Sequence, residues 1–200
     1  MPLCFAMYGN PGAGKAYVSS LVVDSLCDEA RGQNTAVACF YFDYTTQKEQ
    51  SLTSMLGPLL KQVVGGLEGI SEKITRAFRL RLPEIVEMLQ IASSSQHTFI
   101  CVDSLDECVE DNRPKVLGSP RQILLKSPGI RISLTGRAHV RAEVGKSLSG
   151  RIAILVISPR REDISKYLRV RLDEDVNSDA MEDDLETDIM RRIPETDSEM

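Results

Sequence analysis

The chain has few of the residues that build disulfides or metal sites. It contains five cysteines, an odd number without any Cys-x-x-Cys pair, and two histidines among its 200 residues. Cys4, Cys39 and Cys101 lie in strand-like apolar runs, where free cysteine behaves as a small hydrophobic residue. Neither His97 nor His139 has a second metal ligand beside it in the sequence. This usage indicates a reduced, intracellular protein, and we expect a cytoplasmic location.

Long apolar runs and a positive charge balance are also absent. No apolar run approaches the roughly 18 residues that a membrane span needs, and no charged segment followed by an apolar core, typical of a signal peptide, opens the chain. The formal net charge of −5 argues against nucleic acid as the main ligand. The arginines that gather between Arg131 and Arg171 have no interleaved aromatics, and we interpret them first as solvated positions. We therefore expect neither a membrane nor a nucleic-acid partner.

A phosphate-binding loop is the most informative motif that is present. It reads GNPGAGK and consists of Gly9, Asn10, Pro11, Gly12, Ala13, Gly14 and Lys15. In a Gly-x-x-x-x-Gly-Lys loop, backbone N–H groups cradle phosphate oxygens and the lysine reaches the β- and γ-phosphates. A strand-like run precedes the loop and a helical pattern follows it, so the phosphates would meet a helix N-terminus. The motif predicts a nucleoside triphosphate site.

Ala16 follows the loop lysine, where Ser or Thr normally offers a hydroxyl to Mg²⁺. Ser19 and Ser20 lie about a helical turn further on and are poorly placed to substitute. Because Mg²⁺ usually keeps several waters, a water can fill the vacated position. A lost contact to a charged partner is worth roughly 1.5–3 kcal/mol, or about one to two decades of affinity. We expect nucleotide binding to survive in weakened form and hydrolysis to be weak.

Polar residues at the ends of two later strand-like runs complete the candidate site. The run FICVD ends in Asp103, whose carboxylate could hold Mg²⁺ directly or through water. Asp106 or Glu107 on the following loop could orient or deprotonate an attacking water. Arg137 follows the run RISLTG and could reach a γ-phosphate. Arg137 by itself fits a surface arginine equally well.

Five apolar runs of strand length predict the fold class. Helical patterns or long connections separate them, which implies an α/β fold with a mainly parallel sheet covered on both faces. The predicted strands are Leu3–Tyr8, Thr35–Phe42, Thr98–Leu105, Arg131–Thr135 and Ile152–Ile157.

The predicted helices have several start and break signals. Thr46 and Glu49 fit a capping box ahead of an apolar stripe that runs from Leu52 to Val64. Gly57-Pro58 predicts a kink or restart inside that stripe. Pro83 fits the first turn of a later helix.

The last part of the chain differs in composition from the rest. Ser158-Pro159 predicts the cap and first turn of a helix, and a strongly acidic stretch follows it. In a final helix we expect four apolar residues to face inward: Met181, Leu185, Ile189 and Ile193. We divide the chain into a nucleotide-binding domain, residues 1–158, and a truncated helical domain segment, residues 159–200.

Together these motifs resemble the NACHT-type nucleotide-binding domains of signal-transduction ATPases with numerous domains (STAND). The chain is most similar to the nephrocystin-3-like N-terminal module of fungal multidomain receptors. The segments that carry the resemblance are GNPGAGK at Gly9–Lys15, YFDY at Tyr41–Tyr44, DSLDE at Asp103–Glu107, TGRAHVRAEV at Thr135–Val144 and SPRREDISKYL at Ser158–Leu168. The resemblance implies a P-loop NTPase fold, a three-layer sandwich with strand order 5-1-4-3-2, that uses ATP or ADP with Mg²⁺.

The resemblance also implies a role for each candidate residue. Lys15 would contact the phosphates and Ala16 would adjoin them, Asp103 would serve magnesium, Asp106 or Glu107 would lie near the hydrolytic water, and Arg137 would sense phosphate. Members of the family are switches in which ADP holds a closed state and ATP permits homo-oligomerisation. Their protein partners bind through effector and repeat domains that this chain lacks.

Three functions remain open at this stage. The leading hypothesis is a nucleotide-binding switch module, a possible ATPase that Ala16 weakens. The alternative is a non-catalytic interaction scaffold that keeps the P-loop fold without binding nucleotide. It is favoured by departures from the family pattern such as Gly136 and Ala138, which stand where Ser and Pro are usual. A small-molecule kinase fits less well, because we find neither an acceptor pocket nor an arginine-bearing lid.

Overall fold

The structure is a computed structural model that describes residues 4–65, 81–118, 127, 129–148, 152–158, 160–174 and 183–196. Its strands are β1 (Cys4–Gly9), β2 (Thr35–Tyr41), β3 (His97–Asp103), β4 (Ile130–Gly136) and β5 (Ile152–Ile157). Its α-helices are α1 (Lys15–Ala30), α2 (Leu52–Val64), α4 (Leu82–Ser95), α6 (Arg141–Ser147), α7 (Arg161–Asp173) and α8 (Asp183–Thr196). Short 3-10 helices are η1 (Tyr44–Glu49), η3 (Leu105–Glu107) and η4 (Ala138–Val140). The chain divides into two compact units, Met1–Val156 and Ile157–Met200, and each is described by itself.

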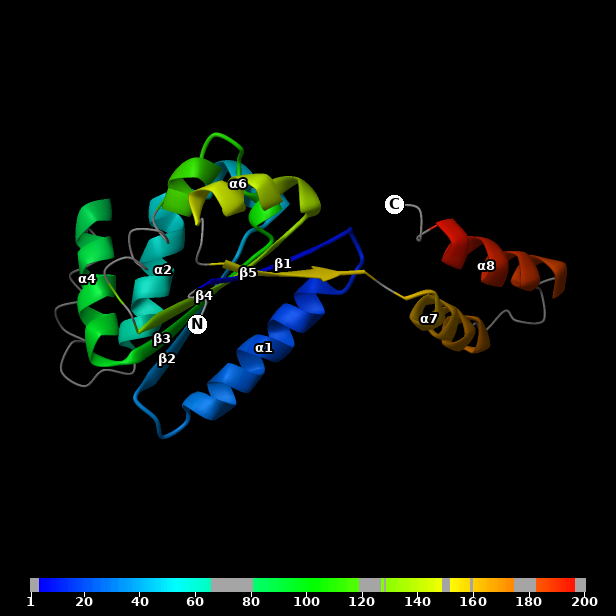
Figure 1. Cartoon of the computed structure of the whole chain (residues 1–200), viewed down its shortest axis with the longest axis horizontal. Coiled ribbons are helices and arrows are strands. Elements are labelled where there is room, and N and C mark those ends of the chain that lie inside the picture. The colour runs from blue at the N-terminus through cyan, green and yellow to red at the C-terminus, as the bar shows by residue number, and fades with distance from the viewer. Residues whose placement is uncertain are drawn as a thin grey trace. The chain divides into compact units, whose positions relative to one another are not determined.

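The five strands form one sheet in the order β2-β3-β4-β1-β5 (Figure 1). This is the predicted order 5-1-4-3-2 read from the other edge, so the predicted α/β fold is confirmed. The pairs β2–β3, β3–β4 and β4–β1 are parallel. Each predicted strand lies within two residues of the observed one, since the buried apolar runs end where polar or glycine residues begin. All strands therefore present their carboxyl ends at one edge of the sheet, where α/β proteins usually bind ligands.

Helices cover the two faces of the sheet unequally. The main hydrophobic core lies on the face covered by α2, α4 and α6, whereas α1 lies on the other face (Figure 1). Side chains alternate along a strand, so Ile100 and Val102 belong to the core while Cys101 and Asp103 lie on the face of α1. The helix α1 buries only Ser19 among its residues.

The start of α2 differs from the prediction. Ser51 caps the helix: its hydroxyl accepts from the Ser54 amide at 3.2 Å, and the Ser54 hydroxyl accepts from the Ser51 amide at 2.7 Å. Thr46 and Glu49 instead lie in η1, which Asp43 caps. The predicted capping box was therefore wrong, because the Ser51 pair is adjacent to the apolar stripe and satisfies the first amides of α2 directly.

Pro58 does not end α2, so the predicted break was also wrong. The helix continues to Val64 with the proline inside it. An interior proline costs about 3 kcal/mol, but full burial of one Leu or Val side chain returns roughly 1.5–3 kcal/mol. Six side chains of this helix are buried: Met55, Leu56, Leu59, Leu60, Val63 and Val64. Packing therefore outweighs the single lost hydrogen bond.

The other predicted helices were right in kind. Pro83 lies in the first turn of α4, as expected, and residues 113–118 form a short helical piece. The preceding residues 66–80 and the following residues 119–126, for which we expected further helical pieces, lie outside the described residues.

The second unit contains α7 and α8. The helix α7 starts at Arg161 and is preceded by Arg160 as its cap, so the predicted start at Ser158-Pro159 was too early. Leu185 and Ile193 on α8 are 53% and 44% exposed, and the prediction that both face inward was wrong. A pair of helices has too little interior to bury every apolar position. Met181 lies outside the described residues. No helix in the described part of the chain is long and apolar enough to cross a membrane.

Candidate functional site

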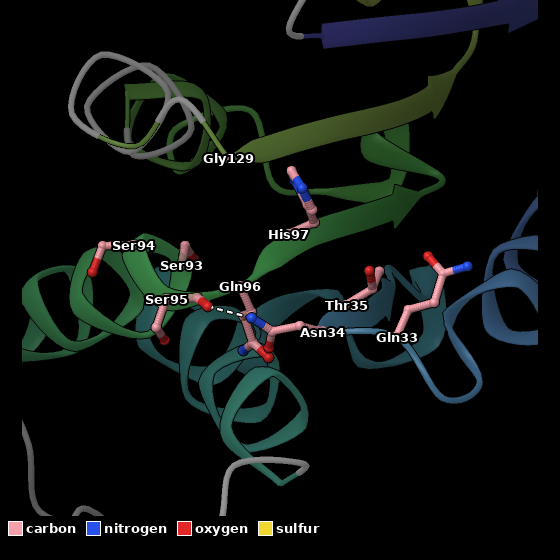
Figure 2. A pocket seen from close by; sticks show the side chains of 9 residues that line it. All are labelled: Gln33, Asn34, Thr35, Ser93, Ser94, Ser95, Gln96, His97 and Gly129. Atoms are coloured by element: carbon pink, nitrogen blue, oxygen red, sulfur yellow. Dashed lines mark hydrogen bonds between the residues drawn. The ribbon is translucent and has the colours of Figure 1, made fainter.

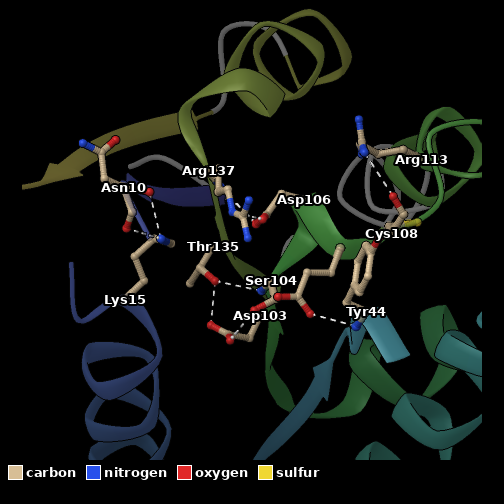
Figure 3. A network of polar contacts seen from close by, with 12 residues as sticks. Asn10, Lys15, Tyr44, Asp103, Ser104, Asp106, Cys108, Arg113, Thr135 and Arg137 are labelled. Carbon is tan, nitrogen blue, oxygen red and sulfur yellow. Dashed lines mark hydrogen bonds and ion pairs between the residues drawn. The ribbon is translucent and has the colours of Figure 1, made fainter. Parts of the chain in front are cut away.

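The phosphate-binding loop connects β1 to α1. Gly12 and Gly14 have φ values of +80° and +82°, a left-handed conformation that residues with a Cβ adopt only under strain. Gly14 is also the residue that precedes the first turn of α1. The Lys15 Nζ donates hydrogen bonds to the carbonyl oxygens of Gly9 and Asn10, each at 2.8 Å (Figure 3). The lysine therefore folds back over the loop, at the place where a phosphate would be held.

The first turn of α1 offers backbone donors to an anion. The leading N–H groups of a helix have no partner within it, and the helix dipole makes this end positive. Ala16 lies in this turn with its side chain exposed to solvent. The turn therefore presents amide groups and the Lys15 ammonium group, but no hydroxyl at position 16.

Asp103 is buried at the end of β3, where its carboxylate accepts two hydroxyl hydrogen bonds. Thr135 Oγ1 donates to Asp103 Oδ1 at 2.6 Å, and Ser104 Oγ donates to Asp103 Oδ2 at 3.1 Å. The Ser104 amide in turn donates to Thr135 Oγ1 at 3.0 Å (Figure 3). Ser104 has a φ of +55°, which is uncommon outside glycine and marks a constrained turn. A buried charge stays ionised when hydrogen bonds of this kind replace its water.

These residues fit a magnesium ion that is held mainly by water and phosphate oxygens. Among the described residues, no group of three or more His, Cys, Asp or Glu side chains is placed to hold a metal. Mg²⁺ commonly binds through one or two carboxylates together with waters and substrate phosphates. Asp103 is one such carboxylate, so the donor set is compatible with Mg²⁺ only when a phosphate ligand contributes as well.

Asp106 is paired with Arg137 on the loop after β3. Its Oδ2 lies 3.0 Å from Arg137 Nε, and its Oδ1 accepts a hydrogen bond from the Arg137 backbone amide at 3.0 Å. The Asp106 side chain is 5% exposed, whereas that of Arg137 is 50% exposed. Figure 3 shows the guanidinium group of Arg137 beside the Asp106 carboxylate.

Glu107 and its neighbours fix the same loop to the rest of the domain. Glu107 Oε2 accepts a hydrogen bond from the Tyr44 amide at 3.0 Å. Next to Tyr44, the Asp43 carboxylate accepts from the Thr45 amide and hydroxyl, and these hydrogen bonds lower the pKa of Asp43. The YFDY segment therefore supports the loop that contains Glu107.

A buried arginine braces the loop from the other side. Arg113 is 5% exposed, and its guanidinium group donates to the Cys108 carbonyl oxygen and to Glu143 Oε1, each at 3.0 Å. Glu143 lies on α6, so this contact joins the loop to a helix that follows β4. Neither Arg113 nor Glu143 was predicted from the sequence, where both read as ordinary polar surface residues.

The strand register brings the predicted site residues to one edge of the sheet. β4 lies between β1 and β3, with Gly136 opposite Tyr8 and Leu134 opposite Val102. Arg137 is therefore level with the first residue of the phosphate loop, and Thr135 is level with Asp103. Sequence reasoning had not assigned roles to Thr135 or Ser104. A polar residue at the end of an apolar strand was the only available signal.

A polar pocket of about 430 Å³ lies at the opposite edge, where the strands begin (Figure 2). Its walls are the loop before β2, the end of α4, the start of β3 and Gly129. The Asn34 side-chain amide closes part of it by donating to the Ser95 carbonyl oxygen at 2.5 Å. Because the loop, Asp103 and Arg137 all lie at the carboxyl edge, this pocket is not part of their site.

Comparison with known proteins identifies the family. The family model "Nephrocystin 3, N-terminal" matches residues 2–137. No curated protein sequence matches the chain. Among solved structures, Orc1 of Aeropyrum pernix in complex with DNA matches with a TM-score of 0.57 and 19% identity, over 87% of this chain and 44% of that one.

Two other structures have the same fold. Drosophila ORC bound to DNA gives a TM-score of 0.62 at 17% identity, over 96% of this chain and 47% of that chain. A Walker-type ATPase of Pyrococcus abyssi gives 0.56 at 15% identity, over 96% of this chain and 60% of that chain. The chain thus spans about half the length of the structures it matches.

At these identities the structural likeness establishes the fold alone, which is that of P-loop ATPases. The DNA in two of those structures belongs to those proteins. The family model supplies the closer assignment, because it covers more than half of the sequence, including the phosphate loop, Asp103 and Arg137. The chain therefore belongs to the nephrocystin 3 N-terminal family.

Proposed function

We propose that this chain is an ATP- and ADP-binding switch module of a NACHT-type signal-transduction protein, and that its hydrolysis is weak or absent. The observation that supports the proposal most strongly is the convergence of Lys15, Asp103 and Arg137 at one edge of the sheet. Each residue type has a distinct use there: an ammonium group for phosphate, a buried carboxylate for Mg²⁺, and a guanidinium group for the terminal phosphate.

Lys15 would exchange its two carbonyl hydrogen bonds for phosphate oxygens when nucleotide binds. Both of its present acceptors belong to the loop itself, so the exchange needs no movement of another element. The positive end of α1 adds to the attraction. Bound Mg²⁺ would neutralise phosphate charge, and Asp103 would hold it, with the Thr135 and Ser104 hydroxyls keeping that carboxylate in place.

Weak hydrolysis follows from the donors that are missing or occupied. Ala16 offers no hydroxyl to Mg²⁺, so the metal has one protein ligand fewer to fix its position. Asp106 uses both carboxylate oxygens on Arg137. Glu107 retains one oxygen that is not engaged by Tyr44 and is the better candidate to orient a water.

Thermal unfolding with and without nucleotide tests the proposal. A ligand at about 100 times its Kd stabilises the folded state by about 2.7 kcal/mol, which for a chain of this size raises Tm by roughly 5–10 °C. We expect this shift with ADP or ATP, and its loss in Lys15→Ala. Ala16→Thr, at an exposed position, should leave the unliganded Tm unchanged and make the shift more dependent on Mg²⁺.

Two outcomes would favour the scaffold alternative. If the parent chain shows no shift but Ala16→Thr does, the module is a decayed ATPase on an intact fold. If no well-folded variant responds to nucleotide, the fold serves as an interaction scaffold and the proposal is wrong. The predicted cytoplasmic location, protein partners and ATP-dependent assembly belong to the same proposal and are testable in the protein that contains this domain.

A further inference from the structure

We propose that Asp106 is a positioning residue: it holds Arg137 in place so that the arginine can discriminate a nucleoside triphosphate from a diphosphate. This inference rests on the proposed nucleotide-binding function and assigns Asp106 a different role from that of a base for the hydrolytic water. It depends on the ion pair, on the strand register and on the space beside Gly136.

The Asp106 carboxylate has no oxygen left for a water. Oδ1 accepts the Arg137 backbone amide and Oδ2 pairs with Arg137 Nε, both at 3.0 Å. A general base must lie within hydrogen-bond reach of the proton that it removes, with a lone pair directed at it. At 5% exposure the side chain also has little contact with solvent. These contacts fix Asp106 as a structural partner of Arg137.

The same contacts hold Arg137 at two points and leave its outer nitrogens available. Asp106 engages the backbone amide and Nε, whereas Nη1 and Nη2 have no hydrogen-bond partner in the part of the chain that the structure describes. An arginine that is held by Nε presents the two terminal nitrogens as a fork, the geometry that suits a phosphate group. Its half-exposed side chain is accessible to a ligand.

The register directs this fork toward the phosphate loop. Gly136 is opposite Tyr8 in the parallel β4–β1 pair, so Arg137 is level with Gly9, the first residue of the loop. A terminal phosphate held by Lys15 would lie at the same edge of the sheet. The diphosphate lacks the group that the fork would contact, so Arg137 would contribute to the affinity of the triphosphate alone.

Gly136 allows the carboxylate to approach. A Cβ at this position would lie 2.9 Å from Val140 Cγ2 and 3.4 Å from Asp106 Oδ1. Val140 is fully buried, so it has little freedom to move away. The departure from the family pattern at position 136 is therefore matched to the Asp106–Arg137 pair.

The test is calorimetric titration of ADP and of the β,γ-imido analogue of ATP into four proteins at fixed Mg²⁺: the parent chain, Asp106→Asn, Arg137→Ala and the double variant. Asparagine keeps an acceptor for the Arg137 amide but removes the charge that holds Nε. We expect Asp106→Asn to lower the ATP-to-ADP affinity ratio roughly ten-fold or more, as the loss of a charge-assisted contact does. In the Arg137→Ala background the same substitution should change the ratio less than about two-fold.

Two further variants separate positioning from stability. Glu143→Gln removes the charged partner of another arginine, Arg113, and should leave the ratio unchanged. Arg137→Lys keeps the charge at a half-exposed position but loses the fork, and should lower the ratio even if Asp106→Asn folds poorly.

Several results would overturn the inference. An unchanged ratio in both Asp106→Asn and Arg137→Lys would do so, as would an equal loss in the Arg137→Ala background. Loss of hydrolysis in Asp106→Asn with an unchanged ratio would instead assign Asp106 to the water. If the folded parent chain binds neither nucleotide, the proposed function fails and the inference fails with it. If the parent binds both and only the ratio is unmoved, the inference fails alone.

Discussion

At the scale of single residues, two adjacent buried carboxylates are satisfied in different ways. Asp103 accepts the hydroxyls of Thr135 and Ser104, which leaves the site without a fixed positive charge beside it. Asp106 has a guanidinium partner. A carboxylate held by hydroxyl groups retains its attraction for a cation, whereas one paired with arginine does not. This difference is the reason that we assign Asp103 to Mg²⁺ and Asp106 to Arg137.

We predict that Thr135→Val destabilises the domain. Valine has nearly the same shape but cannot donate to the Asp103 carboxylate, which remains buried. Loss of a hydrogen bond to a buried charge costs about 1.5–3 kcal/mol. Urea unfolding should show this loss, and Thr135→Ser, which keeps the hydroxyl, should recover most of it. A valine variant as stable as the parent would contradict the proposed network.

Residue types and spacing predicted Lys15, Asp103 and Arg137 but not their partners. The hydrogen bond of Thr135 to Asp103 joins residues that are 32 positions apart. It exists only because β3 and β4 are neighbours in a particular register, which the sequence does not display. The Asp106–Arg137 pair depends on the same register. For this reason the role that the family likeness implied for Asp106 differs from the role that we infer.

At the scale of secondary-structure elements, the free edge of the sheet is partly sealed by one side chain. The strand β2 is at an edge, and an edge strand exposes N–H and C=O groups that can pair with another chain. The Gln62 amide of α2 donates to the Cys39 carbonyl oxygen and accepts from the Cys39 amide, each at 2.9 Å. The side chain thus replaces one residue of a neighbouring strand.

We predict that Gln62→Ala lowers stability by about 1 kcal/mol, since the two backbone groups then return to water. It should also increase aggregation, because the edge of β2 becomes free to pair. Lys61→Ala, the adjacent exposed position on α2, is the matched control. Light scattering during incubation near the Tm would measure the difference, and equal aggregation of the two variants would refute this role of Gln62.

The elements also show which local signals decide a structure. The apolar stripe of α2 predicted the helix correctly, because burial of six side chains dominates its stability. Its cap and its proline were mispredicted, since each contributes less than the packing and has nearby competitors. In α8 the apolar spacing suggested an inward face, but exposure depends on how much of the rest of the protein packs there.

At the scale of the whole molecule, buried thiols link stability to pH. Burial raises the pKa of Cys101 from 9.0 to about 11 and that of Cys4 from 9.0 to about 12. Burial also raises the pKa of Tyr8 from 10.0 to about 12. All three groups lie in or beside the sheet of the first unit. In the unfolded chain they would lose their protons near their ordinary pKa values.

The sign of the effect follows from these directions. Because the folded pKa values are raised, the protons stay bound in the folded state while the unfolded state releases them above about pH 9. Stability should therefore be constant up to pH 9 and fall as the pH rises toward 11–12. Urea midpoints at intervals between pH 8 and 11 would measure this, and Cys101→Ala should make the decline shallower. A midpoint that rises with pH would contradict the account.

The sheet order, the position of the phosphate loop and the five strands could be predicted from alternating patterns and family likeness. The unequal covering of the two faces could not, because it depends on which helices pack on which side after the chain has crossed the sheet. The relation of the second unit to the first is likewise a property of tertiary packing rather than of local sequence.

The central claim is that the loop around Lys15 binds nucleotide despite Ala16. Calorimetric titration of ADP with Mg²⁺ into the parent chain and into Lys15→Ala tests it most directly. We predict micromolar, one-to-one binding by the parent and a loss of roughly ten- to hundred-fold or more in the variant, since a charged phosphate contact disappears. Absence of binding by the folded parent, or equal binding by both proteins, would contradict the account.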